Sequence, residues 1–243
     1  MIKKIVFSTC FIFLLSFLSL NSNFAKTYKR TVSRSYIERS LRLGSDSNQI
    51  WGIDISHHQC NINWNILEKN KPNFMYLKVT EGATHTDKRY QTHIKEARRL
   101  NIPCGAYHFF GYTSSGKTQA QYFIKKAKLQ KGDLHPVLDV EFTRSTYRAR
   151  MNISKEIMAF CKEIYKEFNV YPIIYCNESY FNRYLKKQFN NYNFWICDYR
   201  KKPFRNNYVF WQHTDKAKVK GIKGYVDRNW LHPEKTIENF VLK

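Results

Sequence analysis

Two carboxylates, Asp139 and Glu141, stand two residues apart at the end of an apolar run, His-Pro-Val-Leu-Asp-Val-Glu. On a β-strand, residues i and i+2 point to the same side, so both acids would project into one space, roughly 6–7 Å apart at the backbone. Two negative charges this close oppose each other's ionisation, so one proton tends to stay on the pair. A protonated acid beside a carboxylate is what cleavage of a glycosidic bond requires. The alternative is an acidic strand end that faces solvent.

Several other short apolar runs also carry reactive side chains at or near their ends. These side chains are Asp54, Glu81, Tyr107, Asp198 with Tyr199, Trp211 with Gln212, and Asp227. Each has a structural explanation when taken singly: Asp54 could cap a turn, Glu81 could pair with Lys78, and Tyr107 or Trp211 could belong to the core. Those explanations do not account for a shared position on successive runs, which favours one common cleft.

The runs that carry these residues alternate with helical patterns. This alternation predicts parallel strands joined by crossover helices, and eight strands favour a closed barrel. The predicted strands are 52–56, 74–80, 104–109, 136–141, 173–176, 194–198, 208–213 and 225–229, and the predicted helices are 64–70, 88–100, 116–129, 154–168 and 179–188. Ser154 is the predicted N-cap of the fourth helix. Because the last three connections are too short for regular helices, we expect an irregular α/β barrel that is helix-poor at its end.

The first 49 residues do not share this pattern. Lys3 and Lys4 precede an apolar run over 5–20 and a small residue, Ala25, which is typical of a secretory signal peptide over residues 1–25. The run is short for a membrane span, although an uncleaved membrane anchor is the alternative. Residues 26–49 hold six Lys or Arg against two acids and predict a basic linker. We therefore expect an exported protein, secreted or periplasmic, with one domain over 50–243.

The net charge of +22 requires a partner or a physical reason. Anionic cell-wall polymers, membrane surfaces and nucleic acids are candidates, but the chain has no zinc-finger spacing, RNP motif or P-loop, so we expect no specific nucleic acid. The five cysteines beyond the apolar run are odd in number and widely spaced, which is not a disulfide framework. Cys104, Cys176 and Cys197 are predicted to be small buried hydrophobes. With no Cys-x-x-Cys and only His57-His58 together, we expect no metal site.

Seven motifs in order resemble the lysozymes of glycoside hydrolase family 25, over about residues 50–231. The motifs are Gly-Ile-Asp54-Ile-Ser-His-His-Gln59, Lys78-Val-Thr-Glu81-Gly, Gly105-Ala-Tyr107-His-Phe, Leu138-Asp139-Val-Glu141, Trp195-Ile-Cys-Asp-Tyr199, Trp211-Gln212 and Gly224-Tyr-Val-Asp227-Arg-Asn229. The resemblance implies an irregular, TIM-like (β/α)5β3 barrel. It also implies an N-acetylmuramidase that cuts the β-1,4 bond from N-acetylmuramic acid to N-acetylglucosamine in peptidoglycan, with no cofactor.

The resemblance also implies roles for individual residues. The family's general acid falls on Glu141, its partner carboxylate on Asp139, and two further cleft acids on Asp54 and Asp227. His213 departs from the family, since an aromatic residue is more usual after Trp-Gln. Four more positions are expected to bind substrate: Glu81, Tyr107, Tyr199 and Trp211.

Two mechanisms remain open at this stage. In the first, Asp139 orients the N-acetyl group of the substrate, whose oxygen attacks the anomeric carbon while Glu141 protonates the leaving oxygen. In the second, Asp227 or Asp54 is a protein nucleophile. Burial and the charge of Asp139 should raise the pKa of Glu141 in either case. We expect a monomer that acts on peptidoglycan glycan strands and is held near anionic wall or membrane surfaces by its basic charge.

Three other functions compete with this one. A chitinase is disfavoured because related barrels carry an additional aspartate two positions before the Asp-x-Glu pair, where this chain has Val137. A non-catalytic peptidoglycan-binding protein on a decayed barrel would not need to retain the acids. A secreted metal-dependent nuclease would explain the charge and the acid pair.

Overall fold

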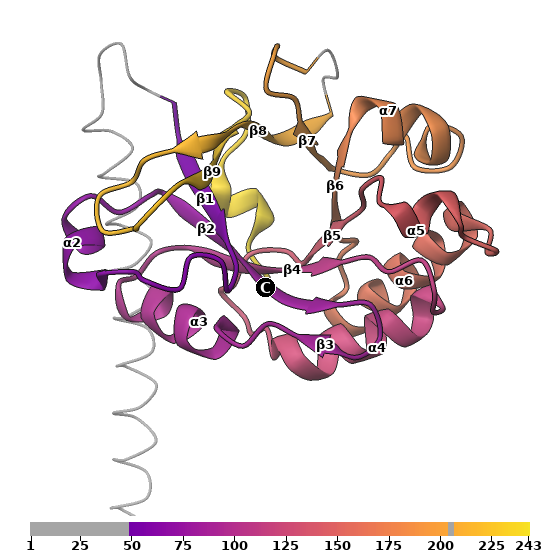
Figure 1. The fold of residues 1–243 in the computed structure, drawn as a ribbon, viewed down its shortest axis with the longest axis horizontal. Helices are drawn as coiled ribbons and strands as arrows, with labels where there is room; N and C mark the ends of the chain where they lie inside the picture. Colours follow the sequence, from indigo (N-terminus) through magenta and orange to yellow (C-terminus); the bar gives the residue numbers. More distant parts are fainter. Residues whose placement is uncertain (1–48, 204–206) are drawn as a thin grey trace, which may run out of the picture. The chain divides into compact units, whose positions relative to one another are not determined.

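The computed structural model describes residues 49–203 and 207–243, which form an α/β barrel (Figure 1). The predicted signal peptide and, apart from Gln49, the predicted linker lie outside the described residues. The eight barrel strands are β1 (Trp51–Ile55), β2 (Phe74–Glu81), β4 (Cys104–Phe109), β5 (Val137–Asp139), β6 (Ile173–Asn177), β7 (Phe194–Cys197), β8 (Tyr208–Ala217) and β9 (Val226–Leu231). Pairing of β1 with β2 closes the sheet, and β3 (His85–Thr86) pairs with the end of β2 outside the ring. The predicted closed barrel is confirmed.

The strands run parallel from β1 through β2 and β4 to β8, but β9 is antiparallel to both of its neighbours. The expectation of a parallel last strand is therefore wrong. The connection from β8 to β9, residues 218–225, is a hairpin loop, whereas a parallel strand would need a crossover of a dozen or more residues. As a result, the first residues of β9 lie at the same end of the barrel as the carboxyl ends of the other strands.

Helices follow the early strands, as expected. They are α2 (Trp64–Lys69), α3 (Tyr90–Arg99), α4 (Gly116–Ala127), α5 (Arg144–Tyr147), α6 (Ile153–Phe168) and α7 (Glu178–Tyr180), which continues into a π-helical turn, Phe181–Leu185. A 3-10 helix, Ile237–Phe240, follows β9. The predicted cap of α6 is wrong: Asn152 accepts from the backbone N–H of Lys155, while the Ser154 hydroxyl donates to the Tyr184 carbonyl. Along residues 198–203 and 207–225 the structure describes no helix, so the helix-poor end is confirmed.

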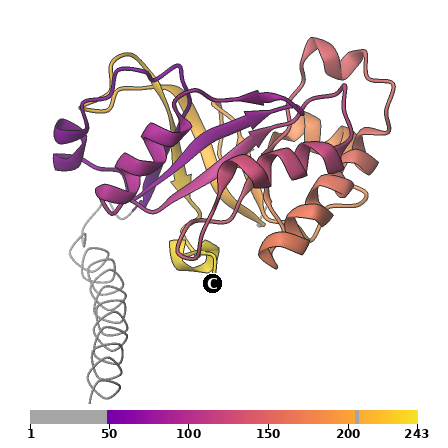
Figure 2. The same ribbon diagram turned by 90° about the horizontal axis from the view of Figure 1, so that it is seen from below.

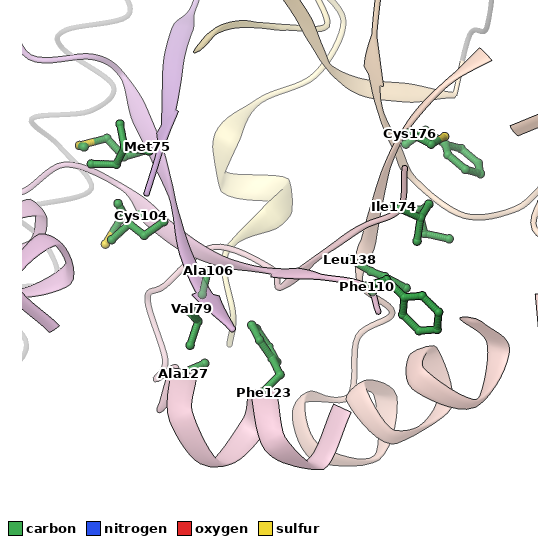
Figure 3. Close-up of a cluster of buried hydrophobic side chains, with 14 of the residues drawn as sticks. Met75, Val79, Cys104, Ala106, Phe110, Phe123, Ala127, Leu138, Ile174 and Cys176 are labelled. Atoms are coloured by element: carbon green, nitrogen blue, oxygen red, sulfur yellow. The ribbon is translucent and has the colours of Figure 1, made fainter. Parts of the chain in front are cut away.

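The hydrophobic core has two layers. Outside the strands, α3 and α4 pack on β2, and α4 packs on α6; Val79 and Ala106 meet Phe123 and Ala127 there (Figure 3). In Figure 2 the helices α4 and α6 lie side by side along the barrel. Inside the barrel, large aromatic rings fill the space: Phe74, Tyr76, Trp195 and Phe210.

Two glycines make room for those rings. A Cβ on Gly52 would lie 2.3 Å from the Phe74 ring, and one on Gly105 would lie 2.4 Å from the Tyr76 ring. The barrel interior is therefore a packed core, and a cavity opens at its carboxyl end. Cys104 and Cys176 are buried as predicted, whereas Cys197 is half-buried.

Candidate active site

A cavity of about 250 Å³ opens at the carboxyl end of the barrel. It is lined by Asp54, Ile55, Ser56, His58, Gln59, Lys78, Tyr107, Phe109, Val137, Asp139, Glu141, Tyr175, Trp195, Tyr199, Gln212 and Asp227. The four acids singled out from the sequence, on β1, β5, the loop after β5 and β9, all reach this cavity. Asp54, the Asp139–Glu141 pair and Asp227 are far apart in the sequence, so the barrel itself brings the four acids together.

Asp54 and Asp227 face each other across the antiparallel pair of β1 and β9. One carboxylate oxygen of Asp54, Oδ2, accepts from Asn229 Nδ2 at 2.8 Å and from Gln212 Nε2 at 3.2 Å. Burial raises the pKa of Asp54 to about 6 against the opposing effect of these two donors. Burial, followed by the charge of Asp54, raises the pKa of Asp227 to about 8. The direct juxtaposition therefore keeps a proton on this pair near neutral pH.

Asp139 ends β5, and Glu141 lies just beyond the strand, which is shorter than the predicted 136–141. Asp139 is buried, and its Oδ1 has no hydrogen-bond partner among the residues that the structure describes. Burial and then the charge of Glu141 raise the pKa of Asp139 well above its ordinary range. Burial also raises the pKa of Glu141, while the nearby hydroxyl of Tyr175 and the ammonium group of Lys78 act in the opposite direction. Burial therefore favours the protonated form of both carboxyls at this end of the cavity.

The backbone of Glu141 is fixed from two sides. Its carbonyl accepts from the Tyr112 hydroxyl at 2.8 Å and from Thr146 Oγ1 at 3.0 Å. Thr146 belongs to α5, which opens with a reciprocal capping box between Thr143 and Thr146. These bonds hold the backbone of Glu141 in place although no strand carries it, and so limit where its carboxyl can lie.

A network of amide and aromatic side chains supports the carboxylates. Gln212 Oε1 accepts from the hydroxyls of Tyr175 at 2.8 Å and Tyr199 at 3.0 Å, while its Nε2 donates to Asp54. Asn229 Oδ1 accepts from Trp195 Nε1 at 2.9 Å, which turns its amide nitrogen toward Asp54. The orientation of both amides is therefore set by donors that leave their N–H groups facing the carboxylate.

The predicted substrate-binding residues divide into two pairs. Tyr107 and Tyr199 line the cavity, but Glu81 and Trp211 do not. The carboxylate of Glu81 accepts from Lys78 Nζ at 2.7 Å, and the indole N–H of Trp211 donates to the carbonyl of Asp198 at 2.7 Å.

Comparison with known proteins places the chain in a family. Residues 53–222 match the sequence model of Glycosyl hydrolases family 25. The chain belongs to glycosyl hydrolase family 25. It is 32% identical to the uncharacterized protein YegX of Escherichia coli strain K12 over 191 residues, 75% of this chain and 70% of YegX. It is 28% identical to lysozyme M1 of Streptomyces globisporus, over 76% of this chain and 68% of that protein.

Solved structures agree with the family 25 assignment. A family 25 glycosyl hydrolase from Bacillus anthracis has a TM-score of 0.73 and 28% identity, covering 82% of this chain and 96% of that one. A bacterial lysozyme from Streptomyces coelicolor has a TM-score of 0.69 and 27% identity, covering 80% and 96%. The resemblance predicted from the seven motifs is confirmed, and this family 25 member is a glycosidase.

The family 25 barrel contains site residues that the sequence analysis did not single out. Lys78, Tyr175 and Trp195 line the cavity, and Asn229 orients Asp54. Tyr175 and Trp195 stand in apolar runs, where an aromatic residue indicates core as readily as a site. Lys78 and Asn229 were quoted only as parts of motifs. Asn229 could have been identified from its spacing, because it stands two residues after Asp227 on one strand and therefore lies on the same face.

Residues 49–203 and 207–243 contain no group of three or more His, Cys, Asp or Glu arranged to hold a metal ion. In the same residues no helix has both the length and the apolar composition that a membrane span needs.

Proposed function

We propose that this glycosidase is a peptidoglycan muramidase that hydrolyses the β-1,4 bond between N-acetylmuramic acid and N-acetylglucosamine, with Glu141 as general acid and base. One observation carries the proposal: four acids from β1, from β5 with the loop after it, and from β9 meet in one cavity, and one of them, Glu141, has its backbone held by hydrogen bonds and its pKa raised by burial. The lysozymes among its relatives support peptidoglycan as the substrate.

In the first step, Glu141 would donate its proton to the leaving glycosidic oxygen. A carboxyl does this at neutral pH only if its pKa is raised, and burial raises the pKa of Glu141. Glu141 would then remove a proton from the water that attacks the intermediate. This change of role needs a carboxyl that stays in place between steps, and the bonds to the Glu141 carbonyl support such a position.

Asp139 is assigned to the substrate's acetamido group. Its Oδ1 is buried and without a partner, so an incoming acetamido N–H could supply the missing hydrogen bond. An acetamido group oriented in this way would attack the anomeric carbon through its own oxygen. With the proton of the Asp139–Glu141 pair on Glu141, the ionised Asp139 would stabilise the positive charge that develops on the group. This favours the substrate-assisted mechanism.

The protein-nucleophile alternative rests on Asp54 and Asp227. Asp227, with its pKa raised to about 8, is largely protonated at pH 7 and is a poor nucleophile there. Asp54 receives two amide donors and ionises more readily, so we assign it to electrostatic stabilisation of the oxocarbenium-like transition state. If a covalent glycosyl-enzyme adduct were trapped on Asp54 or Asp227, that residue would be the nucleophile and the substrate-assisted mechanism would be wrong.

Glu141→Gln tests the proposal directly. We expect the variant to lose roughly 10²–10⁴-fold in the rate of turbidity loss on purified cell walls, because the amide cannot donate the proton. Glu234→Gln, at an exposed carboxyl after β9, is the control and should keep its activity. Near-normal turnover by Glu141→Gln, with an unchanged circular dichroism spectrum, would falsify the general-acid assignment.

Assays on the same preparation of purified enzyme distinguish the rival functions. Lysis that resists a chelator, with no cleavage of DNA, would exclude a metal-dependent nuclease. Wall binding without any loss of turbidity would favour the non-catalytic protein instead. We further propose that the protein acts as an exported monomer, since its substrate lies outside the cytoplasm, in agreement with the signal peptide predicted for residues 1–25.

A further inference from the structure

The hairpin between β8 and β9 carries an unusual concentration of positive charge. Residues 214–225 include four exposed lysines and a single acid, Asp215; the lysines are Lys216, Lys218, Lys220 and Lys223. None of the ion pairs formed by described residues involves any of the four. Their charge is therefore available to a partner.

This hairpin forms one rim of the cavity. The carbonyl of Tyr225 accepts from Gln59 Nε2 at 3.3 Å, and Gln59 lines the cavity. Two residues further on, Asp227 reaches the cavity itself. The tip is held in place by a backbone bond from Lys223 to the Asn61 carbonyl and by a bridge between Ile62 and Ile222. The lysines thus sit on a fixed edge and not on a free loop.

Tyr225 and Lys218 make a specific feature on that edge. The Tyr225 ring is 56% exposed, and Lys218 Nζ lies 5.6 Å from its centroid. An exposed aromatic face packs well against a sugar ring, and an ammonium group beside it can pair with an anion on that sugar. The floor of the cavity, in contrast, is rich in carboxylates and would repel anions.

A ligand that suits both regions has neutral sugar rings over the floor and anionic substituents at the rim. We propose that Lys218 and Tyr225, with Lys216 and Lys220 beside them, form a subsite for the acidic peptide stem carried by the muramic acid of the substrate. This inference rests on the proposed muramidase function and adds a specificity to it: the enzyme should prefer glycan that bears peptide stems over bare glycan.

The test compares soluble glycan strands that carry peptide stems with the same strands after an amidase has removed the stems. We expect wild type to show a higher kcat/KM on the stem-bearing strands. Lys218→Gln should lower this preference about two- to fivefold, and the triple change of Lys216, Lys218 and Lys220 to Gln should lower it further, through KM and not kcat. A matched triple change of Lys125, Lys155 and Lys162, exposed on α4 and α6, should leave the preference unchanged.

Each contrary outcome has a distinct meaning. Equal cleavage of both substrates by wild type would overturn the subsite and leave the muramidase intact. An equal loss on both substrates in the hairpin triple variant would also overturn it, since that is the effect of general surface charge. Cleavage of neither substrate by wild type would overturn the proposed function, and the subsite with it.

Discussion

At the residue scale, the cavity concentrates four acids that destabilise one another when ionised. Burial raises the pKa values of all four acids, and repulsion by neighbouring carboxylates adds to this at Asp54, Asp139 and Asp227. Lys78 opposes part of this effect at Asp139 and Glu141. The cluster should lower the stability of the folded protein at neutral pH, because the same burial and repulsion that retain protons for catalysis make ionisation unfavourable in the folded state.

Asp227→Asn should reveal this penalty. The folded-state pKa of about 8 exceeds the unfolded value of about 3.9, so the folded protein binds the proton more tightly and loses stability as pH rises from about 4 to 8. Asn cannot ionise, so the variant should be more stable than wild type at pH 8 by about 1–3 kcal/mol, with Asp54 sharing the effect, and nearly equal to it at pH 4. Urea unfolding at both pH values measures this. A gain of the same size at pH 4 would contradict the explanation.

The sequence predicted the acids of the site better than their partners. Asp54, Asp139, Glu141 and Asp227 were identified from their positions on successive runs, and all four reach the cavity. Trp211 was chosen from the Trp-Gln motif, but β8 turns its neighbour Gln212 inward. Because side chains alternate along a strand, Trp211 and Gln212 must face opposite sides of the sheet. Which of the two sides faces the barrel interior is known only once the barrel is closed.

At the element scale, the short hairpin before β9 has the largest effect on the site. Because β9 runs antiparallel, Asp227 near its start lies opposite Asp54 near the end of β1. A parallel β9 would place Asp227 at the far end of the barrel. The sequence indicated this strand and the short loop before it. The loop is too short for a parallel crossover, so its length could have predicted that the strand runs antiparallel.

Helix packing gives a second testable feature at this scale. Gly116 begins α4 against the backbone of α6: a Cβ there would lie 1.8 Å from the Glu156 carbonyl oxygen. Gly116→Ala should therefore destabilise the protein by about 1–3 kcal/mol, because α4 must move away from α6. Lys117→Ala, one residue along the same helix, should change stability by less than about 0.5 kcal/mol. Thermal unfolding compares the two, and a neutral Gly116→Ala would show that the helices separate easily.

At the scale of the whole molecule, an acidic cavity is set in a chain of net charge +22. The charge would concentrate the enzyme on anionic walls, and this attraction is screened over about 10 Å at 0.1 M salt. We expect the rate on intact walls to fall by on the order of tenfold between 0.05 and 0.5 M salt, while the rate on a short neutral glycan stays nearly constant. If the rate on intact walls did not change with salt concentration, the net charge would not be what brings the enzyme to the wall.

The overall architecture was largely predictable, because period and order along the chain determine it. Eight apolar runs, five helical segments and a helix-poor end indicated the irregular barrel that is observed. The small elements β3 and α5 were not predicted, since they are too short for a periodic signal. α5 still matters for function because it holds the backbone of Glu141 through Thr146.

If the proposed function is right, this cavity cleaves the bond on the reducing side of N-acetylmuramic acid. Mass analysis of borohydride-reduced fragments released from peptidoglycan of defined composition identifies the bond that is cut. We expect fragments that end in reduced N-acetylmuramic acid. Fragments that end in reduced N-acetylglucosamine would show that the enzyme cuts the other glycosidic bond and is not a muramidase.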